Sequence, residues 1–161
     1  MGHVYLWRKQ HVQAITEQER AIALNPNDAN VYADLAEIMA WMGRPQEALV
    51  MVEKAMRLNP HYPVNYLFIS GFAYSTMERH EEAMSALKKA LTRSPDHLGV
   101  HLMLAIIYGE IGQEEQARAH VAEALRINPQ LSIALLEQIS PFKETAIFER
   151  MGENLRRAGL K

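Results

Sequence analysis

Histidines and carboxylates are the residues of this sequence that could do chemistry. The 161-residue chain has seven histidines and no cysteine. His97 and His101 are four residues apart, the spacing at which an HExxH helix presents two metal ligands on one face. The segment between them is Leu-Gly-Val, with no glutamate, and the sequence places no third ligand beside them. We therefore favour a structural or solvated role for this pair, and expect neither a metal nor a cofactor.

Carboxylates occur in pairs at Glu81–Glu82 and Glu114–Glu115, and singly at Glu144. All lie where helices are predicted to begin, and negative charge there interacts favourably with the helix dipole. This interpretation is preferred to acid–base catalysis. The sequence contains no GxSxG, Walker or GxGxxG motif. Without cysteine there is no thiol nucleophile, thiolate metal site or disulfide. We therefore expect no enzymatic activity from this chain alone.

A recurring heptamer shows how the elements are organised. The four copies are RAIALNP at 20–26, KAMRLNP at 54–60, KALTRSP at 89–95 and EALRINP at 123–129. Their final prolines are 34, 35 and 34 residues apart. A fixed period of this size is typical of a solenoid built from repeated supersecondary units.

Each unit is predicted to be a pair of antiparallel helices. In 29–42 the apolar residues follow helical spacing at Tyr32, Leu35, Ala36 and Met39. Gly43 can end this helix in a left-handed conformation, and Pro45 suits the first turn of the next helix.

Small residues recur where the two helices should approach most closely. They are Ala48, Ala83 and Ala117, followed seven residues later by Ala55, Ala90 and Ala124. The Asn-Pro or Ser-Pro step then ends the second helix, because the residue before proline avoids helical geometry. Asp28 and Asp96 are predicted N-caps of the helices that follow.

These residues resemble the tetratricopeptide repeat pattern W-x2-L-G-x2-Y…A-x3-F…P. The second unit matches at Tyr32, Leu35, Ala36, Met39, Ala48, Val52, Ala55 and Pro60. The third matches at Leu67, Ser70, Gly71, Tyr74, Ala83, Leu87, Ala90 and Pro95. The fourth matches at His101, Leu104, Ala105, Tyr108, Ala117, Val121, Ala124 and Pro129. The resemblance implies an all-α fold, a right-handed superhelical solenoid of antiparallel helix pairs with C-terminal capping helices.

The predicted domain organisation follows from these boundaries. Residues 1–130 form the repeat array, with a truncated first repeat at 1–28 and full repeats at 29–62, 63–97 and 98–130. Residues 131–161 form the C-terminal capping helices. In the first of these, Leu131, Ala134, Leu135 and Gln138 are predicted to face the fourth repeat, and in the last, Ile147, Met151 and Leu155 share one face.

The resemblance also implies a binding surface, because the first helix of each pair lines a concave groove in this family. The groove residues it implies are Trp7, Asn30, Ala33, Glu37, Trp41, Asn65, Phe68, Phe72, Leu102 and Ile106. Trp41, Phe68 and Phe72 are the expected anchors for an apolar or amphipathic peptide segment of a protein partner. Family members that bind the carboxylate tails of chaperones need polar or basic groups at the positions of Ala33, Phe68 and Leu102. Binding of such a tail is therefore disfavoured. The alternative is that these residues are inter-repeat core or are covered by the protein's own tail helix.

The last repeats and tail have a narrower resemblance. HYPVNYLF, the unit HLMLAIIYGEIGQEEQARAHVAEALRINPQ and PFK…FERMGENLRRAGL resemble the C-terminal repeat region of bacterial proteins with an upstream class III adenylate or guanylate cyclase domain. This resemblance implies the alternative function, a regulatory or dimerising accessory region of a larger cytoplasmic signalling protein.

Other partners are constrained by charge and by the first residues. The net charge of −2, with both signs mixed, gives no nucleic-acid surface. No apolar run approaches the roughly 20 residues that span a membrane, and no secretory signal is recognisable. A homodimer through the N-terminal edge at Val4, Tyr5, Leu6 and Trp7 is compatible with either function.

Overall fold

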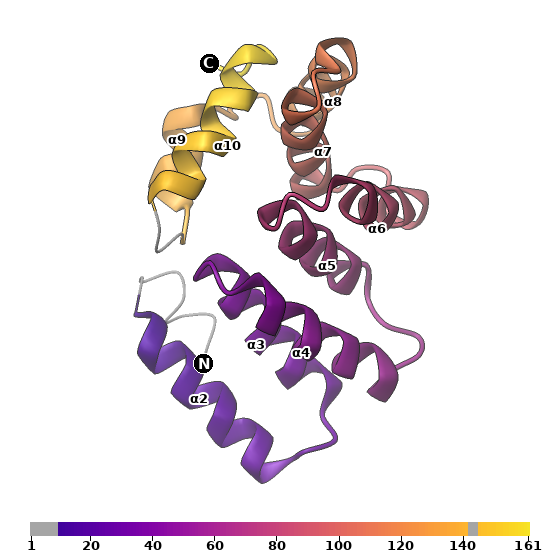
Figure 1. Cartoon of the computed structure of the whole chain (residues 1–161), viewed down its shortest axis with the longest axis vertical. Helices are drawn as coiled ribbons and strands as arrows, with labels where there is room; N and C mark the ends of the chain where they lie inside the picture. The colour runs from indigo at the N-terminus through magenta and orange to yellow at the C-terminus, as the bar shows by residue number, and fades with distance from the viewer. Residues whose placement is uncertain (1–9, 142–144) are drawn as a thin grey trace.

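The computed structural model describes residues 10–141 and 145–161, and this part of the chain forms nine α-helices and no β-strand. The helices of the array are α2 (His11–Leu24), α3 (Ala29–Trp41), α4 (Pro45–Leu58), α5 (Val64–Thr76), α6 (His80–Arg93), α7 (Leu98–Glu110) and α8 (Glu114–Ile127). Two tail helices follow, α9 (Ile133–Ile139) and α10 (Thr145–Arg157). Figure 1 shows the helix pairs stacked in series along a curved array. The all-α solenoid predicted from the sequence is confirmed.

The pairs form where the small residues recur. Helices α3 and α4, α5 and α6, and α7 and α8 pack against each other, and each pair stacks on the next. Ala48 and Ala55 of α4 are fully buried, as are their equivalents in α6 and α8 to within 2%. Gly43 adopts the predicted left-handed conformation with φ of 74°. Pro45 lies in the first turn of α4.

Of the two predicted N-caps, one is confirmed and one is wrong. Asp28 caps α3, because its carboxylate accepts a hydrogen bond from the Asn30 amide at 3.0 Å. The prediction for Asp96 is wrong: the cap of α7 is His97, whose Nδ1 accepts from the Val100 amide at 3.3 Å. Asp96 instead pairs with Arg126 of α8. The imidazole one residue later therefore takes the capping position.

The tail differs from the predicted cap. Helix α9 has only seven residues, with Ile133 buried while Ala134 and Gln138 are exposed. The predicted face is therefore wrong at Ala134 and Gln138, while Leu131, which precedes the helix, is buried as predicted at 6% exposed. It is α10 that packs against α7 and α8, so that α7 lies between α8 and the tail pair (Figure 1). The amide of Ile133 donates to the carbonyl of Lys161 at 2.8 Å, which joins the start of α9 to the chain end.

The buried face of α10 is the one that the sequence predicts. Met151 and Leu155 are 4% and 3% exposed, and Ile147 packs partly buried against the same core. Gly159 ends this segment with φ of 103°. None of the helices in residues 10–141 and 145–161 is both long and apolar enough to cross a membrane.

Candidate ligand-binding groove

An apolar cavity of about 140 Å³ lies between the concave side of the array and the tail helices. The array contributes Trp41, Phe68, Phe72, Gly99, Leu102, Met103 and Ile106. The tail contributes Ile133, Leu136, Ile139, Ser140, Pro141, Phe148, Met151, Gly152 and Leu155. Among the residues that the structure describes, no charged side chain lines this cavity. It is therefore suited to an apolar group and would disfavour a charged one.

Aromatic rings from two repeats form one wall of the cavity. The rings of Trp41 and Phe72 have centroids 4.6 Å apart at an interplanar angle of 54°. Phe68 and Phe72 are 6.3 Å apart, and Phe68 also stacks on His97 at 5.4 Å. Phe72 is only 1% exposed, whereas Trp41 and Phe68 are half-buried. Phe72 thus forms a fixed floor, and the other two rings remain partly accessible.

Five of the ten groove residues expected from the sequence line this cavity: Trp41, Phe68, Phe72, Leu102 and Ile106. The other five do not line it.

Asn30 and Asn65 are exposed at the beginnings of α3 and α5. Asn30 accepts a hydrogen bond from the Tyr66 hydroxyl at 3.0 Å. Ala33 is 3% exposed and packs in the core, and Glu37 is half-buried. Trp7 lies outside the described residues.

The tail wall of the cavity belongs to the alternative that the sequence left open, in which the protein's own tail covers the groove residues. Leu136, Met151 and Leu155 face the array across the cavity, and Ile139 stands at its rim with 49% of its surface exposed. The helix expected to pack on the fourth repeat was the first tail helix, whereas it is α10 that packs on α7 and α8. The amphipathic pattern of Met151 and Leu155 was the available signal, but it does not specify which surface those residues cover.

Charged side chains hold α10 against the array beside the cavity. Arg150 of α10 lies 2.7 Å from a carboxylate oxygen of Glu78 and 3.3 Å from one of Glu110. His80 Nδ1 is 3.6 Å from the other oxygen of Glu110. Burial raises the pKa of Glu110, whose side chain is only 11% exposed, while Arg150 and His80 act in the opposite direction. The carboxylate is therefore costly to bury unless its cationic partners stay in place.

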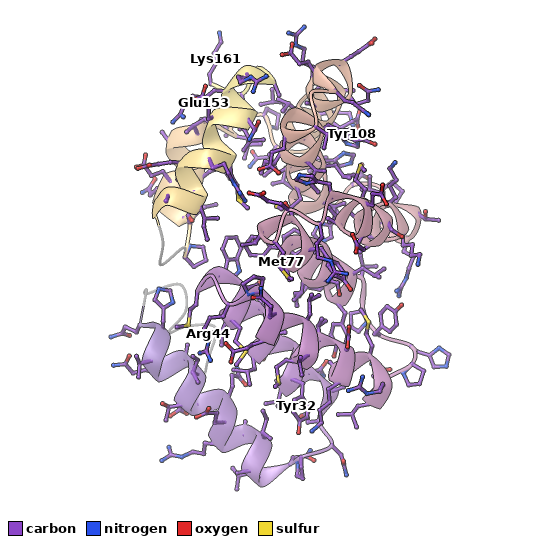
Figure 2. The ribbon with its side chains drawn as sticks, in the orientation of Figure 1. Tyr32, Arg44, Met77, Tyr108, Glu153 and Lys161 are labelled. Carbon is purple, nitrogen blue, oxygen red and sulfur yellow. The ribbon has the colours of Figure 1, made fainter. Side chains whose placement is uncertain are left out.

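The histidines of the predicted pair do not face each other as ligands. His101 Nε2 lies 2.8 Å from the Pro95 carbonyl, so it carries the proton and donates. Its Nδ1 must then accept from His120 Nδ1, 3.0 Å away. The ring of His120 also stacks on Tyr108 at 5.5 Å, on the α8 side of α7 (Figure 2). Within residues 10–141 and 145–161, no three histidine, aspartate or glutamate side chains gather to hold a metal.

Comparison with known proteins identifies the family. A sequence model of the tetratricopeptide repeat matches residues 6–67 and 76–139, which is more than half of the chain. The chain therefore belongs to the tetratricopeptide repeat family, whose members generally mediate protein–protein interaction.

Two curated relatives and one solved structure show the kinds of protein to which this chain is similar. Anaphase-promoting complex subunit 3 of Schizosaccharomyces pombe is 25% identical over 69% of this chain and 16% of its own length. Human Protein O-mannosyl-transferase TMTC1 is 26% identical over 82% of this chain and 15% of its own length. The crystal structure of a thermophilic TPR protein of Thermus thermophilus superposes with a TM-score of 0.74 at 23% identity, covering 98% of this chain and 82% of that one.

The two curated relatives are much longer than the part that matches. This chain spans only about one sixth of each. One of them bears the name of a complex subunit and the other that of a transferase, so repeats similar to these occur in long proteins of different kinds. The structural neighbour, below 25% identity, supports the fold alone.

Proposed function

We propose that this chain is a non-catalytic interaction module that binds an apolar or amphipathic segment of a protein partner. The groove residues would be Trp41, Phe68, Leu102 and Ile106 on the array, with Ile139 at the opposite rim. The observation that carries this proposal is the cavity between them, which is lined without a charged side chain among the described residues. An apolar groove with aromatic anchors is a common way to bind a helical or extended segment.

The test substitutes Ile139, at the rim of the cavity, rather than Phe72, at its floor. Phe72 is almost fully buried, so a charge there would unfold the array rather than report on binding. Ile139 is 49% exposed and can carry a photo-crosslinking amino acid without a buried volume change. Crosslinking from position 139 in a lysate of the source cells, followed by peptide mass spectrometry, would identify the segment that occupies the groove.

A matched pair of variants controls the experiment. Ile139→Glu should abolish partner retention, because it places a charge at the mouth of an apolar site. Val50→Glu should not, because Val50 is comparably exposed, at 56%, on α4 away from the cavity. Equal loss in both variants, or crosslinks only to highly charged segments, would contradict the proposal.

The second candidate is a regulatory or dimerising accessory region of a larger signalling protein of the bacterial adenylate cyclase type. It is supported by the resemblance of the last repeats and the tail. The curated relatives add only that similar repeats occur within longer proteins, since the chain covers about one sixth of each. Sequencing the reading frame upstream of the Met1 codon tests it. An in-frame cyclase domain would support this function, and a stop codon close to Met1 would reject it.

A further inference from the structure

We infer that the cavity between the array and the tail is a pocket for a single aromatic ring, presented by the segment that occupies the groove. The inference rests on the proposed function, because it names the side chain by which that segment would be recognised. It is independent of whether the partner segment is helical or extended.

The volume is the first argument. The cavity measures about 140 Å³, and an apolar cavity of about 150 Å³ in another protein stays dry and binds benzene. A phenyl ring is therefore the size of group that fits. A methyl group would leave most of the volume unfilled.

The lining is the second argument. Trp41, Phe68, Phe72 and Phe148 contribute aromatic rings, and Met103 and Met151 contribute thioether groups. Rings pack favourably against other rings in tilted or offset arrangements, and sulfur makes favourable contacts with ring edges. Trp41 and Phe72 already adopt a tilted arrangement at 4.6 Å. This wall favours an aromatic ring over an aliphatic group of equal volume.

The position of the mouth is the third argument. Ile139 at the rim is half-exposed, whereas Leu102, Ile106 and Leu155 deeper in the cavity are at most 9% exposed. A ring on a peptide lying across the rim would therefore insert between α7 and the tail helices. The charged groups that Arg150 contacts, Glu78 and Glu110, do not line the cavity.

The experiment uses the full chain with carbon-13 in the methionine methyl groups and toluene as the probe. Met103 and Met151 line the cavity, while Met56 and Met84 lie on α4 and α6, outside the lining. On titration, the Met103 and Met151 methyl signals should shift with saturation, through the ring current, and the Met56 and Met84 signals should stay in place. Methylcyclohexane, measured by its competition with toluene for the same signals, should bind at least threefold more weakly. Equal affinities would show an apolar cavity without ring preference and would overturn the inference.

Filling the cavity supplies the matched variants. Leu136→Trp, on the half-buried side of α9, should weaken toluene binding at least tenfold, and Val50→Trp on α4 should leave it unchanged. Ile139→Trp, at the exposed rim, replaces Leu136→Trp if that variant does not fold. Unchanged affinity in the filled variant, or parallel shifts of all methionine signals, would overturn the inference.

The outcomes separate this inference from the proposed function. Absence of toluene binding, together with crosslinking of a partner segment from position 139, would overturn the ring pocket and keep the interaction module. Toluene binding without any partner segment would keep the pocket and remove the support for the module.

Discussion

Glu78 and Arg150 are joined by a 2.7 Å ion pair across 72 residues of sequence, between the turn after α5 and the tail helix α10. Glu78 makes this contact from a left-handed backbone conformation with φ of 59°. Gly43 and Gly112, at the corresponding turns of the neighbouring pairs, have φ of 74° and 76°. Glutamate thus occupies a conformation that glycine adopts more easily, and its carboxylate reaches the tail.

Replacing Glu78 by glycine should loosen the tail without weakening the array. A left-handed non-glycine residue costs about 1 kcal/mol, and an exposed ion pair contributes at most about 1 kcal/mol. The two effects nearly cancel in the free energy of unfolding. Amide hydrogen exchange in α10 should nevertheless become several-fold faster in Glu78→Gly. Glu78→Asn, which tolerates this conformation but lacks the charge, should behave alike, and unchanged exchange in both would contradict a docking role.

Removing Arg150 should lower the free energy of unfolding more than replacing Glu78 does, because Glu110 is then buried without its nearest cation. We expect Arg150→Met to lower the free energy of unfolding by about 1–3 kcal/mol. Urea denaturation at pH 7 measures the change. Adding Glu110→Gln should restore at least half of the loss, because it removes the uncompensated charge. A double variant no more stable than Arg150→Met would show that Arg150 acts through packing instead.

Gly71 and Leu87 form a size-matched pair. A Cβ added at Gly71 would lie 2.5 Å from Leu87 Cγ. The equivalent pairs in the flanking repeats are Ala36 with Val52 and Ala105 with Val121, each also sixteen residues apart. Glycine in the third repeat therefore accommodates the larger leucine.

Gly71→Ala should accordingly destabilise the protein by about 1–3 kcal/mol, despite the higher helix propensity of alanine. Leu87→Val in the same chain should recover most of this loss, giving a favourable coupling energy in a double-mutant cycle. Gly152→Ala is the control, because its Cβ would meet only Arg156 at 3.7 Å or beyond. We expect it to be neutral or stabilising by up to about 1 kcal/mol. Additive effects of the first two changes would contradict the pairing.

His120 should make stability depend on pH. Burial, with smaller contributions from the charges of His101 and Lys88, lowers the pKa of His120 to about 4. The neutral form is therefore favoured in the folded state, so stability is full above pH 6.5 and falls as the pH drops toward 4.

The full pKa difference would correspond to about 3.4 kcal/mol, and solvent screening of the half-buried ring reduces this to about 1–2 kcal/mol. Denaturant unfolding at pH 7 and pH 4.5 measures it. In His120→Gln, which cannot titrate, the difference in the free energy of unfolding between pH 7 and pH 4.5 should shrink by that amount. An unchanged pH dependence would show that other groups cause it.

The hydrogen bond of His101 has a counterpart that the repeat alignment could not reveal. Tyr32 donates from its hydroxyl to the Pro26 carbonyl at 3.1 Å, six residues earlier, as His101 Nε2 does to Pro95. Both residues stand at the first position of the repeat motif in their units. Their shared role is to tie the first helix of a repeat to the proline that ends the previous one.

Within the described residues, the sequence alone determined the helix pairs, their turns and their buried faces. These features depend on neighbours within one repeat, such as Gly43, Pro45 and Ala48, and local spacing records such neighbours directly. The period of 34 to 35 residues then fixed the stacking, because each pair can bury its remaining apolar face only against the next one.

Tertiary structure decided where the tail goes and what the groove becomes. The short α9 turns the chain so that α10, rather than α9, covers α7, and the concave side gains a second wall. Arg150 meets Glu78 and Glu110 only because of that path, and no periodicity relates residues 72 and 40 positions apart. The amphipathic pattern of α10 specifies that one face is buried, but the surface that buries it depends on the whole chain.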